Sequence, residues 1–131
     1  MLRKITLFGV LIALAWNLYL VIGAALNMEA ILPRVAGGGY DSLPVALRIV
    51  YFVQILLTIF QIGFVTILYA RDGAWSRNSY LITRIFLVLA VVSTLVNAVS
   101  RSHLERWNAI SAAAIAVGFY FLGNVKIRPM R

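Results

Sequence analysis

The residues best suited to chemistry in this chain are uncharged amides and hydroxyls that lie within otherwise apolar segments. Gln54 and Gln61 stand seven positions apart with Thr58 between them, so a helix would present all three on one face. Asn17 lies within an earlier apolar segment and Asn97 within a later one. Because polar groups are costly in lipid, residues of this kind indicate either hydrogen bonds between helices or a binding seam.

Hydrogen bonds that hold helices together are the favoured interpretation of these amides. The alternative is a polar seam that binds a small ligand or conducts an ion or solute. A conducting path needs polar groups throughout the depth of the membrane. We expect Asn17 and Gln61 to lie at similar depth, with leucine, isoleucine and valine above and below them.

Arg84 is the one charged residue well inside an apolar segment. We expect its stem to follow the helix and its guanidinium to reach the cytoplasmic headgroups. The alternative is an inward guanidinium paired with an acceptor, such as an amide of a neighbouring helix or an acidic group of another subunit. A buried guanidinium without a partner would be strongly disfavoured.

A second group of reactive types consists of Glu29, Asp41, His103 and Glu105, which we place on the outer side of the membrane. Carboxylates and an imidazole bind metals or transfer protons where they converge. However, Ser102 and Glu105 have the spacing of a capping box, in which Glu105 reaches back to the start of a helix. We therefore predict no catalytic residue and no metal site. The absence of cysteine also excludes thiol chemistry and a disulfide framework.

The elements that must position these residues are four apolar segments. With 63% hydrophobic and 12% charged residues, the chain has no material for a soluble domain. A helix of roughly 20 residues crosses the hydrocarbon core. The sequence therefore predicts an all-α, integral membrane, antiparallel four-helix bundle that forms a single domain, 1–131. Its spans cover about 5–26, 46–70, 80–100 and 103–125.

The longest connection between spans is the predicted outer loop, 27–45. It contains Pro33 and the run Gly37-Gly38-Gly39, which a helix would not tolerate cheaply. We expect this loop to be either flexible or wrapped against the bundle. Pro44 suits the opening of the second span, where its missing N–H costs little.

The fourth segment carries a face of small residues, which includes Ser111 and Gly118. Such faces let helix backbones approach closely in lipid. We expect this face either to pack within the bundle or to contact another chain.

Lysine and arginine predict the orientation of the bundle. Seven lie on the side of the termini, at residues 3, 4, 71, 77, 126, 128 and 131, and four lie on the other side, at residues 34, 48, 101 and 106. Both termini are therefore predicted to be cytoplasmic. The net charge of +8 forms mostly a cytoplasmic rim that attracts anionic headgroups. We predict no nucleic-acid partner, since no soluble module presents this charge.

The stretch from Asn97 to Asn108 contains an asparagine, a serine, a Ser-x-x-Glu-Arg motif and a tryptophan. This pattern resembles the helix hairpin of small bacterial four-helix integral membrane proteins. The resemblance covers about a tenth of the chain, and it implies no particular activity. Length and span number are also similar to those of small multidrug exporters and fluoride channels. The exporters' glutamate in the first span and the channels' glycine-rich signature are missing here.

The favoured functional hypothesis is an accessory or scaffold subunit of a larger complex in the bacterial plasma membrane. The small-residue face and the Gln54–Gln61 face would contact membrane lipids and another membrane protein or a second copy of the chain. The alternative is a homo-oligomeric carrier or channel lined by Asn17, Gln54, Gln61 and Asn97. A lipid-related enzyme is third. No cofactor is predicted, and a bound lipid is compatible with all three hypotheses.

Overall fold

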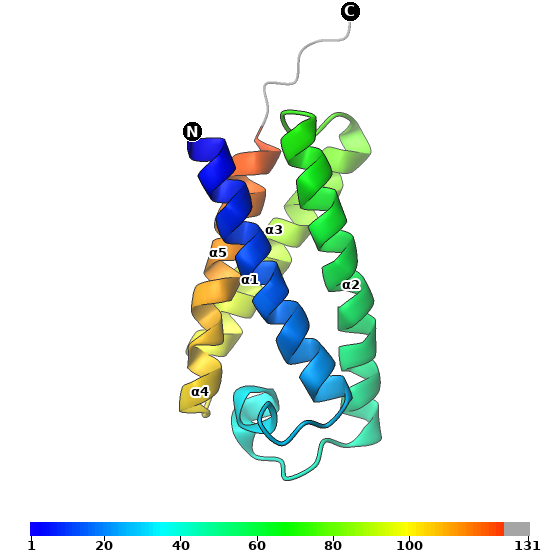
Figure 1. Cartoon of the computed structure of the whole chain (residues 1–131), viewed down its shortest axis with the longest axis vertical. Helices are drawn as coiled ribbons and strands as arrows, with labels where there is room; N and C mark the ends of the chain where they lie inside the picture. Colours follow the sequence, from blue (N-terminus) through cyan, green and yellow to red (C-terminus); the bar gives the residue numbers. More distant parts are fainter. Residues whose placement is uncertain (125–131) are drawn as a thin grey trace, which may run out of the picture.

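The computed structural model describes residues 1–124, and within that range the chain is helical without strands. Its long helices are α1 (Leu2–Ala25), α2 (Val45–Ala70), α3 (Arg77–Ala98) and α5 (Asn108–Gly123). A single turn, α4 (His103–Arg106), precedes α5, and two short 3-10 turns, η1 (Leu32–Arg34) and η2 (Ala36–Gly38), lie in the first loop (Figure 1). The all-α prediction is confirmed for these residues. The basic residues predicted at positions 126, 128 and 131 lie outside them.

The helix boundaries agree closely with the second predicted span and less closely with the others. Helix α1 begins at Leu2 rather than at residue 5, and α3 covers Arg77–Ala98 rather than 80–100. The earlier start of α3 has a local cause. The Ser76 hydroxyl accepts from the Ser79 amide at 3.1 Å, and the Ser79 hydroxyl accepts from the Ser76 amide at 2.9 Å. This reciprocal cap uses a serine where glutamate or glutamine is usual, so the sequence does not show the usual capping-box motif.

The fourth predicted span, 103–125, is helical from His103 to Gly123 except for an irregularity at Trp107, and residue 125 lies outside the described residues. The structure divides the segment at Trp107 into α4 and α5. The Trp107 amide bonds to the Glu105 carbonyl, and the Ile110 amide bonds to the Trp107 carbonyl. These short-range bonds interrupt the regular pattern of an α-helix at this point.

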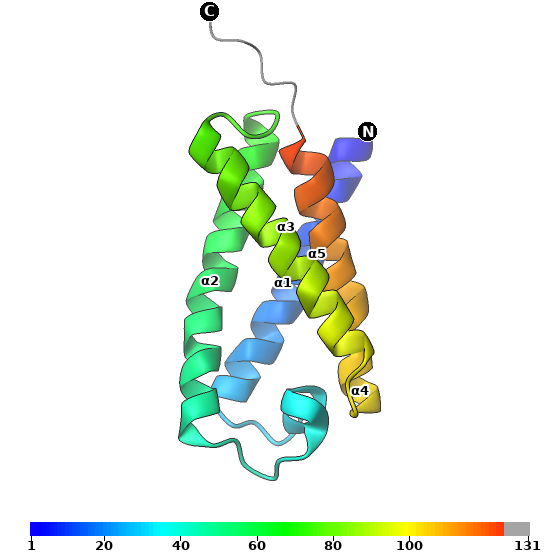
Figure 2. The ribbon, with the colours of Figure 1, turned by 180° about the vertical axis from the view of Figure 1, so that it is seen from behind.

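The bundle is built around α5, which packs against α1 on one side and α3 on the other, while α1 also packs against α2. By contrast, α2 and α3 barely touch, and they diverge toward the end that carries the first loop (Figure 2). The tightest packing involves two glycines of α5. A Cβ atom on Gly118 would lie 2.0 Å from Cγ2 of Val10, and one on Gly123 would lie 2.1 Å from Cγ2 of Thr83. The small-residue face therefore packs within the chain at these positions.

The first loop is wrapped against the bundle, which is one of the two predicted alternatives. Its apolar side chains form a second small core with Leu20 and Ala24 of α1; the buried loop members are Ile31, Leu32, Val35 and Leu43. Gly37 and Gly38 have φ values of 78° and 69°, which other residues adopt only with strain. Two of the three glycines therefore shape the turn that lets the loop fold back.

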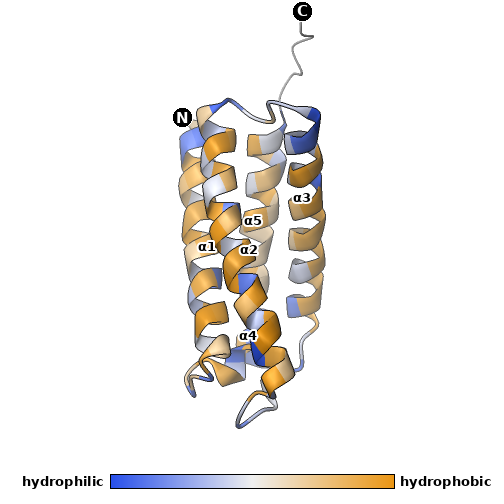
Figure 3. Cartoon of the chain, turned by 90° about the vertical axis from the view of Figure 1, so that its right-hand side faces the viewer, coloured by the Kyte–Doolittle hydropathy of each residue, from blue (hydrophilic) through white to orange (hydrophobic). Residues whose placement is uncertain are grey.

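The outer surface of the helices is apolar along most of their length (Figure 3). Helices α1, α2 and α3 are each long and apolar enough to cross a bilayer. Large side chains such as Phe52, Leu56 and Val88 are at least 49% exposed, and a soluble protein rarely presents so much contiguous apolar surface. Membrane association follows from this surface.

Candidate functional site: a polar cavity between the helices

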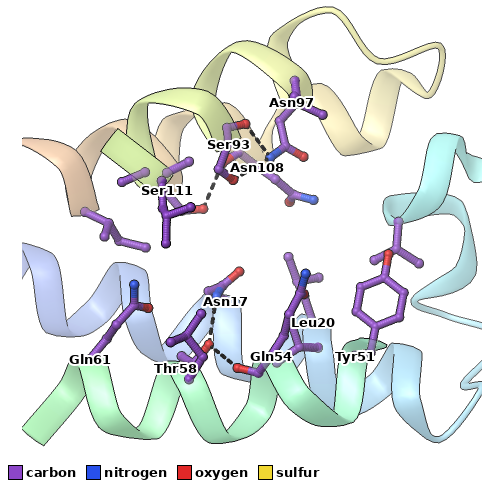
Figure 4. Close-up of a pocket in the computed structure, with 18 residues that line it drawn as sticks. Asn17, Leu20, Tyr51, Gln54, Thr58, Gln61, Ser93, Asn97, Asn108 and Ser111 are labelled. Carbon is purple, nitrogen blue, oxygen red and sulfur yellow. Dashed lines mark hydrogen bonds between the residues drawn. The ribbon is translucent and has the colours of Figure 1, made fainter. Parts of the chain in front are cut away.

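A cavity of about 360 Å³ lies within the bundle, in the half that carries the first loop. Four long helices contribute to its wall, together with Val35 of the loop. Figure 4 shows the polar side chains of α1 and α2 facing those of α3 and α5 across it. Its polar lining consists of Asn17, Tyr51, Gln54, Thr58, Gln61, Ser93, Asn97, Asn108 and Ser111.

The structure brings together five of the seven residues predicted as ligand or partner contacts. Asn17, Gln54, Gln61, Asn97 and Ser111 all line this cavity, although they come from four helices. Asn17 bonds to Thr58, which lies one turn from Gln61 on α2. The other two candidates lie elsewhere: Arg84 is nearer the end with the termini, and Gly118 is buried against Val10.

Several of the lining groups are already paired with other protein groups. Asn17 donates to the Thr58 hydroxyl at 3.2 Å, which links α1 to α2. Asn97 donates to the Ser93 carbonyl at 2.8 Å, within its own helix, and Ser111 donates to the Asn108 carbonyl at 2.9 Å. The interpretation of these amides as packing groups therefore holds for Asn17, which bonds across helices. It does not hold for Asn97, whose described bonds stay within α3.

Gln54 and Gln61 differ from the other lining amides. Neither side-chain amide has a hydrogen-bond partner within residues 1–124, although the Gln54 main-chain carbonyl accepts from Thr58. Gln61 is only 8% exposed, while Gln54 stands at the open edge of the cavity. The Gln61 amide atoms are nevertheless not fully enclosed, because Arg3 Nε is the one enclosed side-chain atom without a partner in residues 1–124. The cavity thus contains an amide whose hydrogen-bonding capacity is unused and open to a molecule that enters it.

Within residues 1–124, the cavity wall carries no aspartate, glutamate, lysine, arginine or histidine, and Tyr51 is its titratable side chain. Amides and hydroxyls supply both donors and acceptors but neither a strong acid nor a strong base near neutral pH. Such a wall favours hydrogen bonding to an uncharged polar group.

Both ends of the cavity are closed by packed side chains. Toward the termini, a phenylalanine cluster of Phe64, Phe86 and Phe119 packs about one helical turn beyond the lining residues, and each of these rings is at most 6% exposed. Phe86 lies 5.9 Å from Phe64 and 5.2 Å from Phe119 between ring centroids. Toward the loop, Val35 and Tyr51 pack together in the second core. No polar path therefore runs along the bundle through this cavity.

Arg84 has a feature of each of the two arrangements considered for it, since its side chain extends toward one end of the bundle and also meets an amide of a neighbouring helix. Its guanidinium lies 5.0 Å from the Tyr80 ring centroid. It also donates, at 3.4 Å, to the side-chain amide of Asn124, which lies at the end of the neighbouring helix α5. The N-terminus lies at this same end, since Arg3 is 3.9 Å from Asp72 in the α2–α3 turn. Arg84 therefore extends toward the end of the bundle rather than into the cavity.

The outer group of acids and histidine does not assemble within the described residues. No cluster of three metal-binding side chains occurs in residues 1–124, and Glu29 and Asp41 are exposed. His103 packs edge-on against Trp107, as expected for a first-turn residue. Ser102 accepts from the Glu105 amide at 3.2 Å, so half of the predicted capping box is confirmed. The other half is wrong, because the Glu105 carboxylate accepts from the Gly37 amide and from the Ser100 hydroxyl instead of the Ser102 amide.

The predicted contact set lacks four polar lining residues, Tyr51, Thr58, Ser93 and Asn108. Asn108 is the one that bonds to both the first loop and α1. It is 7% exposed, donates to the Arg34 carbonyl at 2.9 Å and accepts from the Trp16 indole at 3.4 Å. In the sequence, Asn108 is visible only as an amide at the start of the small-residue segment. Its hydrogen-bond partners depend on how the first loop folds back, which the sequence does not show. No family model, no curated protein and no solved structure matches the chain.

Proposed function

We propose that this protein is a multi-pass protein of a bacterial plasma membrane that binds a small uncharged molecule inside its helical bundle. In this proposal the four long helices all span the membrane, with both termini cytoplasmic. The four residues of α4, Trp107 and the sixteen residues of α5 together provide about 30 Å of helix, which is sufficient for the fourth crossing. The excess of lysine and arginine at the end with the termini supports the orientation.

The observation that carries the proposal is the unused amide of Gln61 in a cavity of neutral polar groups. In hydrocarbon, water cannot be assumed to satisfy such a group, whereas a ligand with a hydroxyl or carbonyl can. The volume of about 360 Å³ is within the usual range for small-molecule sites. It is too small for a transmembrane helix of a partner, which is about 10 Å across.

The shape of the cavity bears differently on the two alternative functions, a carrier and an accessory subunit. A carrier would need the phenylalanine cluster or the loop to move, because both ends of the cavity are closed. An accessory subunit is our second proposal, and the observation that favours it is Gln54, an exposed amide at the open edge of the cavity without a side-chain partner within residues 1–124. A partner helix that donates to Gln54 would be held in the membrane plane.

The test compares the wild type with Gln61→Met, which keeps the side-chain length but removes the amide. The proteins are extracted in mild detergent, and native mass spectrometry records molecules retained by each chain. We expect the wild type to hold one small molecule and the variant to lose it.

The matched control is Thr66→Val, which removes a polar group of α2 that bonds only to the Ile62 carbonyl and does not line the cavity. It should keep the retained molecule. A less stable Gln61→Met protein with unchanged retention would show that the amide serves packing alone, and the binding proposal would fail. Retention of a second, different protein chain in place of a small molecule would favour the accessory subunit.

A further inference from the structure

The outer face of α3 has a charged part and an apolar part. Next to the α2–α3 turn it carries Arg77 and Arg84, which are seven positions apart and therefore lie on one side of the helix. Farther along the same side are three exposed apolar residues: Val88, Val91 and Leu95. Phe86 and Ala90, which α3 buries, lie on the opposite side. This outer side therefore faces away from the bundle along its whole length.

The side chain of Arg84 extends toward the end of α3 that carries Arg77. Helical side chains lean toward the N-terminus of their helix, and α3 begins at this end. The Arg84 guanidinium accordingly lies 5.0 Å from the ring centroid of Tyr80, which is four positions nearer the end. The Cα atoms of the two arginines are about 10 Å apart along the axis. Their charged groups therefore belong to one region of the surface, just above the apolar part.

The positive charge of this region is not balanced by carboxylates of the described chain. The chain has four acidic residues, and three of them lie in the first loop or in α4, at the opposite end (Figure 1). The fourth, Asp72, already faces Arg3 at 3.9 Å. Within residues 1–124, neither Arg77 nor Arg84 is paired with an acid. Guanidinium groups close to hydrocarbon are costly unless an anion accompanies them.

From this arrangement we infer that the outer face of α3 binds an anionic phospholipid whose headgroup is otherwise uncharged, such as phosphatidylglycerol. The phosphodiester would lie between Arg77 and Arg84, and an acyl chain would run along Val88 and Leu95. Arginine suits this task, because its planar guanidinium donates to two phosphate oxygens at once. A zwitterionic phospholipid fits less well, since its ammonium group would meet the two cations while Asp72 faces Arg3.

This lipid site is separate from the cavity. The cavity lies in the half of the bundle that carries the first loop, whereas the two arginines lie at the end with the termini. The inference therefore goes beyond the proposed function and does not depend on it. It places the bound phospholipid in the leaflet next to the termini, whichever side of the membrane that is.

The experiment titrates the protein in mild detergent with two lipids that have the same dioleoyl chains, phosphatidylglycerol and phosphatidylcholine. Native mass spectrometry measures the fraction of chains that retain each lipid. We expect the wild type to retain phosphatidylglycerol at least tenfold better than phosphatidylcholine. Inorganic phosphate at the same concentration should not displace the lipid, because it has no acyl chain to contact the apolar part of the face.

Three single variants test the position of the site. Arg77→Gln and Arg84→Gln should each weaken phosphatidylglycerol retention about fivefold, the change expected for one basic residue beside anionic lipid. The matched control is Lys4→Gln, which removes an exposed cation at the same end but from α1, and it should weaken retention less than twofold. Arg77 is exposed, so its replacement does not disturb packing. Circular dichroism checks the helix content of all three.

Each contrary outcome has a specific meaning. Equal retention of the two lipids, or displacement of phosphatidylglycerol by inorganic phosphate, would overturn the inference. Equal weakening by all three variants would also overturn it, because diffuse attraction by every basic residue at this end would then explain the retention. None of these results would change the retention of a small molecule through Gln61, which tests the proposed function separately.

Discussion

The side-chain amide of Asn108 donates to the main-chain carbonyl of Arg34 at 2.9 Å, across 74 positions of sequence. The same side chain accepts from the Trp16 indole at 3.4 Å. One buried amide therefore joins the first loop, α1 and the start of α5. Because Asn108 also lines the cavity, these bonds help to hold the loop over its outer end.

Replacing Asn108 with leucine should lower the free energy of unfolding by about 2 kcal/mol, because the Arg34 carbonyl would lose a partner within the fold. The matched variant is Asn97→Leu, which removes an amide that bonds only within α3. We expect it to cost less than 1 kcal/mol. Unfolding in mixed detergent and dodecyl sulfate, followed by circular dichroism, measures both. Equal losses would mean that the bond between Asn108 and the loop contributes little.

The sequence predicts the helices well because the requirement for long apolar segments is strong. It predicts their ends less well. Helix α3 begins with a serine pair at Ser76 and Ser79 that does not match the usual capping motif, and Trp107 interrupts a segment whose sequence predicts continuous helix. Both features depend on individual hydrogen bonds, which hydrophobic periodicity does not contain.

Gly118 is expected to tolerate no larger residue, since a Cβ atom there would lie 2.0 Å from Cγ2 of Val10. Gly118→Ala should destabilise the bundle by about 1–3 kcal/mol through overpacking between α5 and α1. Gly63→Ala is the control, because an added Cβ meets no atom within 4 Å there. It should be neutral or slightly stabilising, as alanine favours a helix over glycine by about 1 kcal/mol. The same unfolding assay compares them, and a neutral Gly118→Ala would contradict the close packing of α1 and α5.

Glu105 should protect the glycine turn of the first loop from hydrogen exchange. Its carboxylate accepts from the Gly37 amide at 2.9 Å. Glu105→Gln keeps the shape but removes the charge, and hydrogen bonds to a charged group are roughly twice as strong as neutral ones. A loss of about 1 kcal/mol corresponds to about fivefold faster exchange at Gly37. Hydrogen–deuterium exchange measures it, with Glu29→Gln, an exposed carboxylate of the same loop, as the control. Equal exchange in the two variants would mean that this bond does not order the turn.

The cavity shows which spatial relations between residues can be predicted from the sequence and which cannot. The spacing of Gln54, Thr58 and Gln61 is enough to place them on one helix face, and Asn17 faces them because neighbouring antiparallel helices match residues at equal depth. The close packing of α5 is different. Gly118 lies against Val10 of α1 and Gly123 against Thr83 of α3. Those contacts join distant positions, and no local pattern encodes them.

The proposed orientation can be measured directly, because the chain has no cysteine and any introduced thiol is the only one. Gly39→Cys lies in the first loop with open space around its Cβ position, and Asn78→Cys lies in the exposed first turn of α3 at the opposite end. We expect a membrane-impermeant maleimide to label Gly39→Cys in intact cells and to label Asn78→Cys only after permeabilisation. Val88→Cys, whose side chain faces the bilayer in the proposed orientation, should react slowly in both conditions, because a thiol in hydrocarbon rarely forms the reactive thiolate. The reverse pattern at Gly39 and Asn78 would place both termini outside.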